Sequence, residues 1–340
     1  MHTDFHGIRG IANWVAAIVL LGVIPPLPSQ GIPSAQQIQI ESALVSVPVI
    51  VTDSQGKFVP GLDAGAFTLF QDSIRTPFSL FLTSQDPIRI ALLLDTSKST
   101  TTVLGKIKKA AKRFLLQMRS HDQAMVVSFD SDVRVLCPLS ADRKELEEGI
   151  QNAEAGGTAT KMRDAVVEIA QNRFRSIPGR TAIVLLTDGQ DHGSAISSTD
   201  LFDAIAASGT LIYTVFYRVD PRELAKELFG VKTRSVPSGT HGDKGPRSAW
   251  DEDEERAARY LQQLSELSAG RFYRGTAAEF DAIFKQISDE LRAQYLIGFY
   301  PDKTKLDGTM HSLDVRVDSP GATVRSRRSY RAARESVPAQ

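Results

Sequence analysis

One apolar run that ends in carboxylate and hydroxyl side chains constrains the fold of this chain more than any other feature. Residues 88–94 are almost all apolar, and Asp95, Ser97 and Ser99 follow directly. An apolar run of this length, bounded by polar residues, predicts a strand buried on both faces of a parallel sheet. Such a strand carries its following loop to the carboxyl edge of the sheet, where open α/β sheets bind ligands. The loop offers hard oxygen ligands that suit Mg²⁺, Ca²⁺ or Mn²⁺, although a simple helix cap at Ser97 or Ser99 is the alternative.

Strands and helices alternate after residue 88. The predicted strands are 88–94, 124–129, 181–186 and 210–217, and the predicted helices between them are 103–118, 143–153, 161–174 and 201–208. A strand at 133–137 follows its predecessor too closely for a crossover helix, so we expect an antiparallel hairpin at the sheet edge. Repeated βα units indicate an α/β fold with a doubly wound, mostly parallel, Rossmann-like sheet.

Short β segments flank this region. Residues 36–86 and 295–331 are rich in Val, Ile and Phe and are divided by turn signals. Each segment is short for an independent core. We therefore expect the flanking strands to pair into one small β-sandwich, with the α/β domain, residues 87–294, inserted between them. Residues 332–340 are expected to be a disordered tail.

Residues 218–255 interrupt the alternation with a Pro- and Gly-rich stretch and an acidic run at 251–255. We expect an exposed loop insertion, with a short helix at 221–229. The acidic run is expected to be a solvated part of this loop that leads into a helix at 256–268, and a metal site is its alternative.

The amino terminus has the layout of an export signal. Residues 14–24 are uninterrupted apolar, Arg9 precedes them, and a Pro- and Ser-rich stretch reaches Ala35. This pattern is typical of a secretory signal peptide, here residues 1–35, and the run is short for a membrane span. We expect a periplasmic, cell-surface or extracellular protein with no transmembrane span in the mature chain; an uncleaved anchor is the alternative.

Charge and cysteine content exclude several classes of function. Lys plus Arg equals Asp plus Glu at 40 each, and this balance argues against nucleic acid as a partner. The single cysteine, Cys137, excludes an intrachain disulfide and a multi-thiolate metal site.

Three polar loops are predicted to meet at the carboxyl edge of the sheet. The first is Asp-x-Ser-x-Ser at residues 95–99, the second Gly-Gly-Thr at 156–158, and the third Thr-Asp-Gly at 187–189. In this order they resemble the metal-ion-dependent adhesion site (MIDAS) of von Willebrand factor A (VWA) domains. The resemblance covers about residues 86–295. The flanking β segments, with Tyr-Leu-Ile-Gly-Phe-Tyr-Pro at 295–301, are similar to a secreted, acidobacterial-type group of VWA-related proteins.

The resemblance implies a metal site made of Asp95, Ser97, Ser99, Thr158 and Asp188. It implies Ser97 and Ser99 as direct ligands, Asp95 and Asp188 as ligands directly or through water, and Thr158 as a direct ligand in one conformation. A hard dication held mainly by hydroxyls and water keeps much of its charge, so its open position attracts an outside carboxylate. We expect Mg²⁺, or else Mn²⁺ or Ca²⁺, and a protein partner that offers an Asp or Glu.

Two other pairs of residues near these loops have open interpretations. Asp191 and His192 either contact a ligand or are solvated residues of the loop. Asp130 and Asp132 either shape a hairpin turn or hold a second cation.

The leading hypothesis is an exported adhesion or protein-binding module, and not an enzyme. The first alternative is a structural envelope protein whose VWA scaffold works without metal. The second is a metal-dependent hydrolase, but the first loop lacks the Asp-x-Asp of haloacid dehalogenase-type phosphatases. The chain also lacks a Walker loop, a Gly-x-Gly-x-x-Gly motif after the first strand, and a Gly-x-Ser-x-Gly elbow.

Overall fold

The computed structural model describes residues 44–175, 177–218 and 249–334. The chain divides into two compact units, residues 1–41 and 42–340, and every described residue belongs to the second. The predicted signal peptide and the predicted helix at 221–229 lie outside the described residues. None of the described helices is long and apolar enough to cross a membrane.

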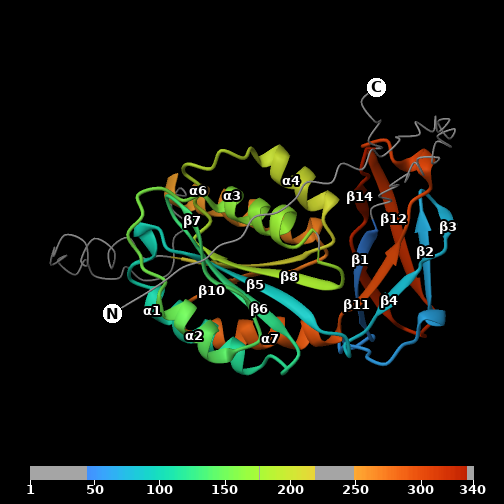
Figure 1. Ribbon diagram of the computed structural model, residues 1–340, viewed down its shortest axis with the longest axis horizontal. Helices are drawn as coiled ribbons and strands as arrows, with labels where there is room; N and C mark the ends of the chain where they lie inside the picture. Colours follow the sequence, from blue (N-terminus) through green and yellow to red (C-terminus); the bar gives the residue numbers. More distant parts are fainter. Residues whose placement is uncertain (1–43, 176, 219–248, 335–340) are drawn as a thin grey trace, which may run out of the picture. The chain divides into compact units, whose positions relative to one another are not determined.

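A six-stranded sheet forms the centre of the α/β part (Figure 1). Its strand order is β10-β9-β8-β5-β6-β7, and every neighbouring pair is parallel except β6 with β7. The strands are β5 (Ile88–Asp95), β6 (Gln123–Phe129), β7 (Val133–Ser140), β8 (Arg180–Thr187), β9 (Leu211–Tyr217) and β10 (Phe272–Gly275). The predicted fold class is confirmed, and the antiparallel hairpin lies at the sheet edge as expected.

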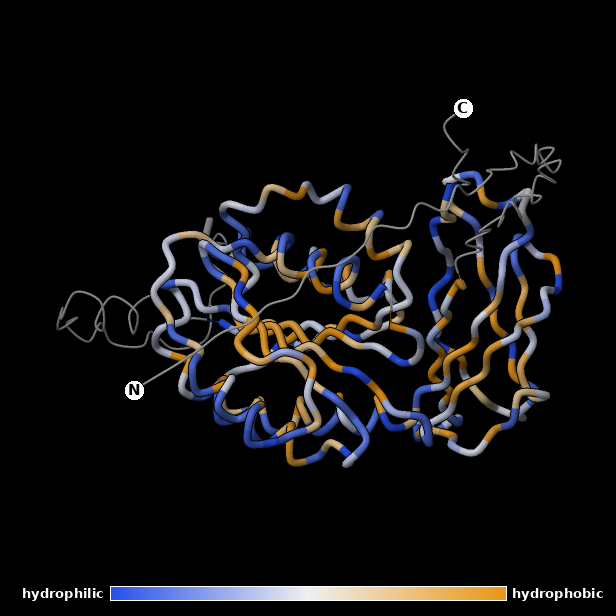
Figure 2. Tube along the Cα trace, viewed as in Figure 1, coloured by the Kyte–Doolittle hydropathy of each residue, from blue (hydrophilic) through white to orange (hydrophobic). Residues whose placement is uncertain are grey.

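Helices cover both faces of this sheet (Figure 1). One face carries α1 (Leu104–Leu116), α2 (Arg143–Gln151) and α7 (Phe280–Ala293); the other carries α3 (Met162–Val167), its π-helical continuation Glu168–Arg173, α4 (Ser198–Ala207) and α6 (Ala249–Leu267). Alternate residues of a strand point to opposite faces, so Leu92 and Leu94 pack on the first set of helices and Leu93 on the second. Figure 2 shows the hydrophobic residues concentrated on these central strands, as the run at 88–94 predicts.

The acidic run at 251–255 is helical, and the expectation of a loop there is wrong. Helix α6 begins at Ala249, ahead of the expected start at Arg256. Carboxylates in the first turns of a helix are stabilised by the partial positive charge of its N-terminus. Partners distant in sequence also hold them, because Glu255 pairs with Arg274 at 2.8 Å and Glu254 with Arg218 at 3.4 Å. Glu254 and Glu255 thus serve as ion-pairing groups of this helix.

The flanking strands form two four-stranded antiparallel sheets, as predicted. Their orders are β13-β1-β11-β4 and β14-β12-β2-β3. The strands are β1 (Val45–Thr52), β2 (Phe67–Gln71), β3 (Ile74–Thr76), β4 (Leu80–Leu82), β11 (Tyr295–Phe299), β12 (Met310–Val317), β13 (Thr323–Ser326) and β14 (Ser329–Arg331), with short 3₁₀ turns at Ala64–Ala66 and Lys303–Lys305. Strands from the two ends of the chain pair directly, with Val47 opposite Ile297 and Leu69 opposite Val315. These four side chains share one apolar core.

The expectation of a disordered tail from residue 332 is wrong for its first residues. Ala332 is buried, and its N–H donates to the carbonyl of Thr309 at 2.9 Å. Arg334 forms a β-bridge with Asp307. Residues 335–340 lie outside the described residues.

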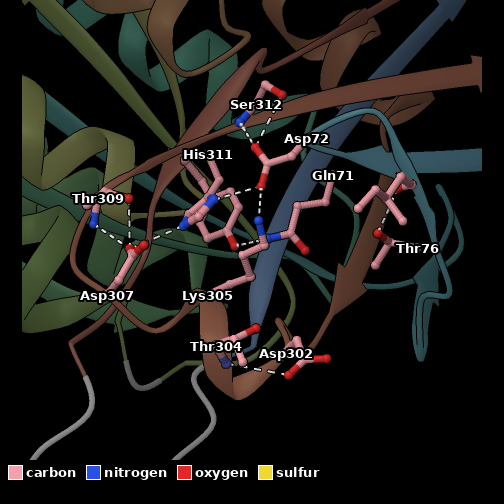
Figure 3. A network of polar contacts seen from close by, with 12 residues as sticks. Gln71, Asp72, Thr76, Asp302, Thr304, Lys305, Asp307, Thr309, His311 and Ser312 are labelled. Atoms are coloured by element: carbon pink, nitrogen blue, oxygen red, sulfur yellow. Dashed lines mark hydrogen bonds and ion pairs between the residues drawn. The ribbon is translucent and has the colours of Figure 1, made fainter.

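A polar network ties the β2–β3 turn to β12 (Figure 3). Asp72 accepts hydrogen bonds from Lys305 Nζ at 2.9 Å, from His311 Nδ1 at 2.8 Å and from the Ser312 N–H at 3.0 Å. The other ring nitrogen of His311 contacts Asp307 Oδ1 at 3.2 Å, and the ring stacks on Tyr330. Although burial opposes it, these donors hold the pKa of Asp72 well below its ordinary value.

Candidate metal centre

Asp95 is held in place by hydrogen bonds at the centre of the candidate site. It is the last residue of β5 and is completely buried. Its Oδ1 accepts hydrogen bonds from the Ser97 N–H at 3.0 Å and from Ser97 Oγ at 2.5 Å. Its Oδ2 accepts one from Thr187 Oγ1, at the end of β8, at 2.9 Å. One carboxylate therefore links the first loop to the third.

The hydroxyls of Ser97 and Ser99 lie together beside this carboxylate. Their Oγ atoms are 3.0 Å apart. Ser97 precedes the 3₁₀ turn Lys98–Thr100, but its side chain makes no capping hydrogen bond to that turn. Helix capping therefore does not explain the Ser97 hydroxyl. Thr100 Oγ1 holds the loop closed by donating to the carbonyls of Asp95 and Ser97 at 3.1 and 2.8 Å.

The Gly-Gly-Thr loop runs alongside the first loop. Gly157 forms a β-bridge with Ser97, and the Lys98 N–H donates to the Gly157 carbonyl at 2.9 Å. The Gly156 N–H donates to the Thr96 carbonyl at 3.1 Å. These contacts bring Thr158, which follows directly and is solvent-exposed, to the neighbourhood of Ser97.

Asp130 lies in contact with both the first and the second loop. It accepts a hydrogen bond from Thr96 Oγ1 at 2.9 Å and forms an ion pair with Arg134. A Cβ added at Gly157 would lie 2.3 Å from the Cβ of Asp130, so only glycine allows this approach. Asp130 Oδ1 also accepts from the Asp132 N–H at 3.1 Å, so the structure supports the hairpin-turn interpretation of these two residues.

The third loop places Asp188 immediately after β8. The Gly189 N–H donates to Thr187 Oγ1 at 3.0 Å, and Asp188 Oδ1 accepts from the Gln190 N–H at 3.1 Å. Gly189 has a φ of 80°, which favours glycine. The loop is therefore shaped by its glycine and by the same threonine that contacts Asp95.

Two carboxylates influence each other at the site. Burial, and then the nearby charge of Asp188, raise the pKa of Asp95 to about 7 despite hydrogen bonds from Ser97 and Thr187. The same two carboxylates contribute, after burial, to the raised pKa of Tyr217. The Tyr217 hydroxyl is buried and has no hydrogen-bond partner among the described residues. Two carboxylates and three hydroxyls with this charge balance fit a hard divalent cation.

Asp191 and His192 stabilise the third loop. Asp191 pairs with Arg163 at 3.2 Å and accepts from Ser194 Oγ at 2.9 Å. The main chain of His192 exchanges two hydrogen bonds with Thr160, each 3.0 Å long. These contacts favour the interpretation of both residues as loop structure.

The site contains supporting residues that motif matching does not identify. Tyr217 belongs to none of the three motifs, and Thr187 belongs to the Thr-Asp-Gly motif but is assigned no role of its own by the resemblance. Within the described ranges, no group of three or more His, Cys, Asp or Glu side chains is placed to hold a metal. A site built from only two carboxylates, with hydroxyls as the other ligands, does not form such a group.

Comparisons with known proteins find a similarity within the α/β part. Residues 90–190 match the family model of the von Willebrand factor type A domain. No curated protein matches the chain in sequence.

Several solved structures are similar at low identity. A von Willebrand factor type A protein from Catenulispora acidiphila is 13% identical over 88% of this chain and 76% of its own, with a TM-score of 0.45. BatB from Bacteroides thetaiotaomicron is 17% identical over 60% of this chain and 97% of its own, with a TM-score of 0.43. Proximal thread matrix protein 1 from the mussel byssus is 15% identical over 61% of this chain, with a TM-score of 0.43. The match spans about half of the mussel protein, 48% of its length.

Proposed function

We propose that this chain, which contains a von Willebrand factor type A domain, is an exported module that binds an acidic side chain of a protein partner through a divalent cation. The observation that carries the proposal is the hydrogen-bonded group of Asp95, Ser97 and Ser99. Asp188 lies close enough to raise the pKa of Asp95, and the loop that bears Thr158 pairs with Ser97.

Each residue has a defined role in this proposal. Ser97, Ser99 and Thr158 would contribute hydroxyl oxygens, and Asp95 and Asp188 would contribute carboxylate oxygens directly or through water. Mg²⁺ is the expected cation, with Mn²⁺ or Ca²⁺ as substitutes. When bound, the cation would supply a positive centre with an open coordination position, which attracts a carboxylate from outside. The exposed position of Thr158 leaves the site accessible to such a partner.

Export is part of the proposal. It is supported by the apolar run at 14–24 with its Pro- and Ser-rich continuation. The sequence at 295–301 and the flanking sheets support membership of the acidobacterial-type secreted group.

Calorimetric titration with Mg²⁺ and with Mn²⁺ tests the metal site. We expect saturable binding to the wild-type chain and its loss in Asp95→Ala and Asp188→Asn. Asp132→Asn is the matched control, because Asp132 lies on a neighbouring loop and its side chain is 73% exposed. Equal binding to wild type and Asp95→Ala would remove the site, and loss in Asp132→Asn alone would place the cation elsewhere.

A pull-down from an envelope extract tests the partner. We expect capture by the wild-type chain in Mg²⁺, release by EDTA, and no capture by Asp95→Ala. Retention of the partner in EDTA would instead favour a structural protein with a metal-independent scaffold. Competition by free acetate, at an ionic strength matched with chloride, tests whether the partner's group is a carboxylate.

A further inference from the structure

A second candidate site lies at the opposite end of β5 from Asp95. A pocket there is lined by Ile88 at the start of β5, by Phe114 of α1, and by Asp122, Arg119, Arg180 and Arg292. Its cavity volume is about 20 Å³. Because one water molecule needs about 10–15 Å³ on this scale, the enclosed part of the pocket has room for about one oxygen atom of a larger ligand, and the rest of that ligand would lie at the exposed rim.

The three arginines come from three separate parts of the chain. Arg119 follows α1, Arg180 begins β8, and Arg292 lies in the last turn of α7. Arg180 is buried, Arg119 is partly buried and Arg292 is exposed. Arginine side chains therefore lie both at the buried end of the pocket and at its exposed rim.

Each guanidinium group donates to main-chain carbonyls. Arg180 donates to the carbonyls of Asp86, at 2.7 Å, and Leu291, and Arg292 donates to that of Gln117. Arg119 donates to the carbonyl of Ser84. None of the three arginines forms an ion pair with a described residue. Carbonyl oxygens orient the guanidinium groups but leave their charge uncompensated.

The carboxylates near the pocket are already engaged by N–H groups. Asp122 accepts from the Ile88 N–H at 3.1 Å and from the Arg119 N–H at 2.9 Å. Asp86 accepts from the Thr83 N–H at 2.8 Å. Three positive charges therefore face two carboxylates, both of which already accept hydrogen bonds from the main chain.

Arg180 has unused hydrogen-bonding capacity. Its Nε has no partner among the described residues, although the side chain is only 1% exposed. Burial, together with the charge of Arg119, lowers the pKa of Arg180 to about 10, while Asp122 and Asp86 oppose this change. A buried donor without a partner, in a positively charged pocket, favours an anionic acceptor.

We propose that this pocket binds a free tetrahedral oxyanion, sulfate or phosphate, through Arg119, Arg180 and Arg292. The bound anion connects the end of α1, the start of β8 and the end of α7. It also lies next to the β4–β5 connection, whose Ser84 and Asp86 carbonyls accept from two of the arginines. Anion binding therefore stabilises the point where the chain passes between the small sheets and the α/β part.

Titration of the full chain with sodium sulfate and with sodium phosphate tests this proposal. The titrations are made in EDTA, which keeps the result independent of the metal centre, and at an ionic strength held constant with chloride. We expect saturable binding with one site and a rise in Tm beyond that in chloride. Loss of one charge-assisted hydrogen bond should weaken binding about tenfold or more in Arg292→Met and in Arg119→Met.

Arg259→Met is the matched control, because Arg259 is an exposed arginine of α6 and lies outside the pocket. Arg292 is also exposed, so its replacement leaves the fold intact, as circular dichroism would verify. Absence of saturable binding to the wild type would overturn the proposal. The same conclusion would follow if Arg292→Met bound sulfate as tightly as Arg259→Met.

Discussion

Thr187 Oγ1 donates a hydrogen bond to Asp95 Oδ2 across 2.9 Å, and thereby joins the ends of the neighbouring strands β8 and β5. The same oxygen accepts the Gly189 N–H at 3.0 Å. One hydroxyl group thus orients the buried carboxylate and shapes the loop that carries Asp188.

Replacement of Thr187 by valine should weaken cation binding without removing any proposed ligand. Residues that orient ligands typically change metal affinity about 10–100-fold when they are mutated. We therefore expect this loss for Mg²⁺ in Thr187→Val, measured by calorimetry. Thr187→Ser keeps the hydroxyl and should retain most of the affinity; equal loss in both variants would contradict a role for the hydrogen bond.

Gly157→Ala should disrupt the contact between the first two loops. The added Cβ would lie 2.3 Å from Asp130 Cβ, so the loops must separate. Overpacking of this kind costs about 1–3 kcal/mol of unfolding free energy, which urea denaturation would measure. Gly156→Ala is the matched control, because a Cβ there meets nothing within 4 Å. Equal stability of the two variants would show that the loop adapts.

The buried carboxylate of Glu290 in α7 should be essential for stability. It is 1% exposed, accepts from Tyr213 Oη at 2.7 Å, and pairs with Arg271 at 3.2 Å and with Arg325 of β13. Glu290→Ala leaves the buried Tyr213 hydroxyl without its acceptor, whereas Arg271 and Arg325 are partly exposed to water, so the variant should lose about 1–3 kcal/mol of unfolding free energy. Asp314→Ala, which breaks an exposed pair with Arg316, should lose less than about 1 kcal/mol. Similar losses in the two variants would contradict this assignment.

The network around His311 should make stability depend on acidic pH. Hydrogen bonds from the Thr309 main chain and side chain hold the pKa of Asp307 at about 2, and the pKa of Asp72 is also lowered. A carboxyl whose pKa is lower in the folded state stabilises the fold above its unfolded pKa of about 4 and loses this effect as the pH falls towards 2.

Urea denaturation at several pH values from about 5 to about 3 tests this dependence. Asp72→Asn should be less stable than wild type at the higher pH, and the difference should narrow as the pH falls. The exposed Asp302, in the same segment, gives the control variant Asp302→Asn. A difference between wild type and Asp72→Asn that stays constant with pH would contradict the prediction.

Sequence patterns predicted those elements whose structure is indicated by their own residues and by the residues next to them. The run at 88–94 is apolar along its whole length because both faces of β5 are covered, and this is visible without a structure. The β6–β7 hairpin was predictable because its connection is too short for a helix. The flanking segments were recognisable as strands, and their assembly into paired sheets is confirmed. The partner of each strand is set by contacts between residues such as Val47 and Ile297, which lie far apart in sequence.

The acidic run at 251–255 shows where local patterns fail. Its charge density suggests solvated loop, but the helix continues into residues whose side chains pack in the core, such as Leu261 and Leu264. Its ion pairs with Arg274 and Arg218 join residues that local sequence does not associate with it. At the candidate site the three loops were predictable as motifs. The role of Thr187 and the close approach of Gly157 to Asp130 were not, because each depends on the distance between separate strands. The assignment of the five metal ligands stays a prediction.

The pairing of β1 depends on the last part of the chain. Both neighbours of β1, β11 and β13, come from the last part of the chain. During synthesis the whole α/β region emerges before β11 and β13. The central sheet can therefore form while both edges of β1 are still unpaired. Unpaired strand edges promote aggregation. A chain that terminates before residue 295 would therefore carry a complete central sheet and a first strand with no partner on either side.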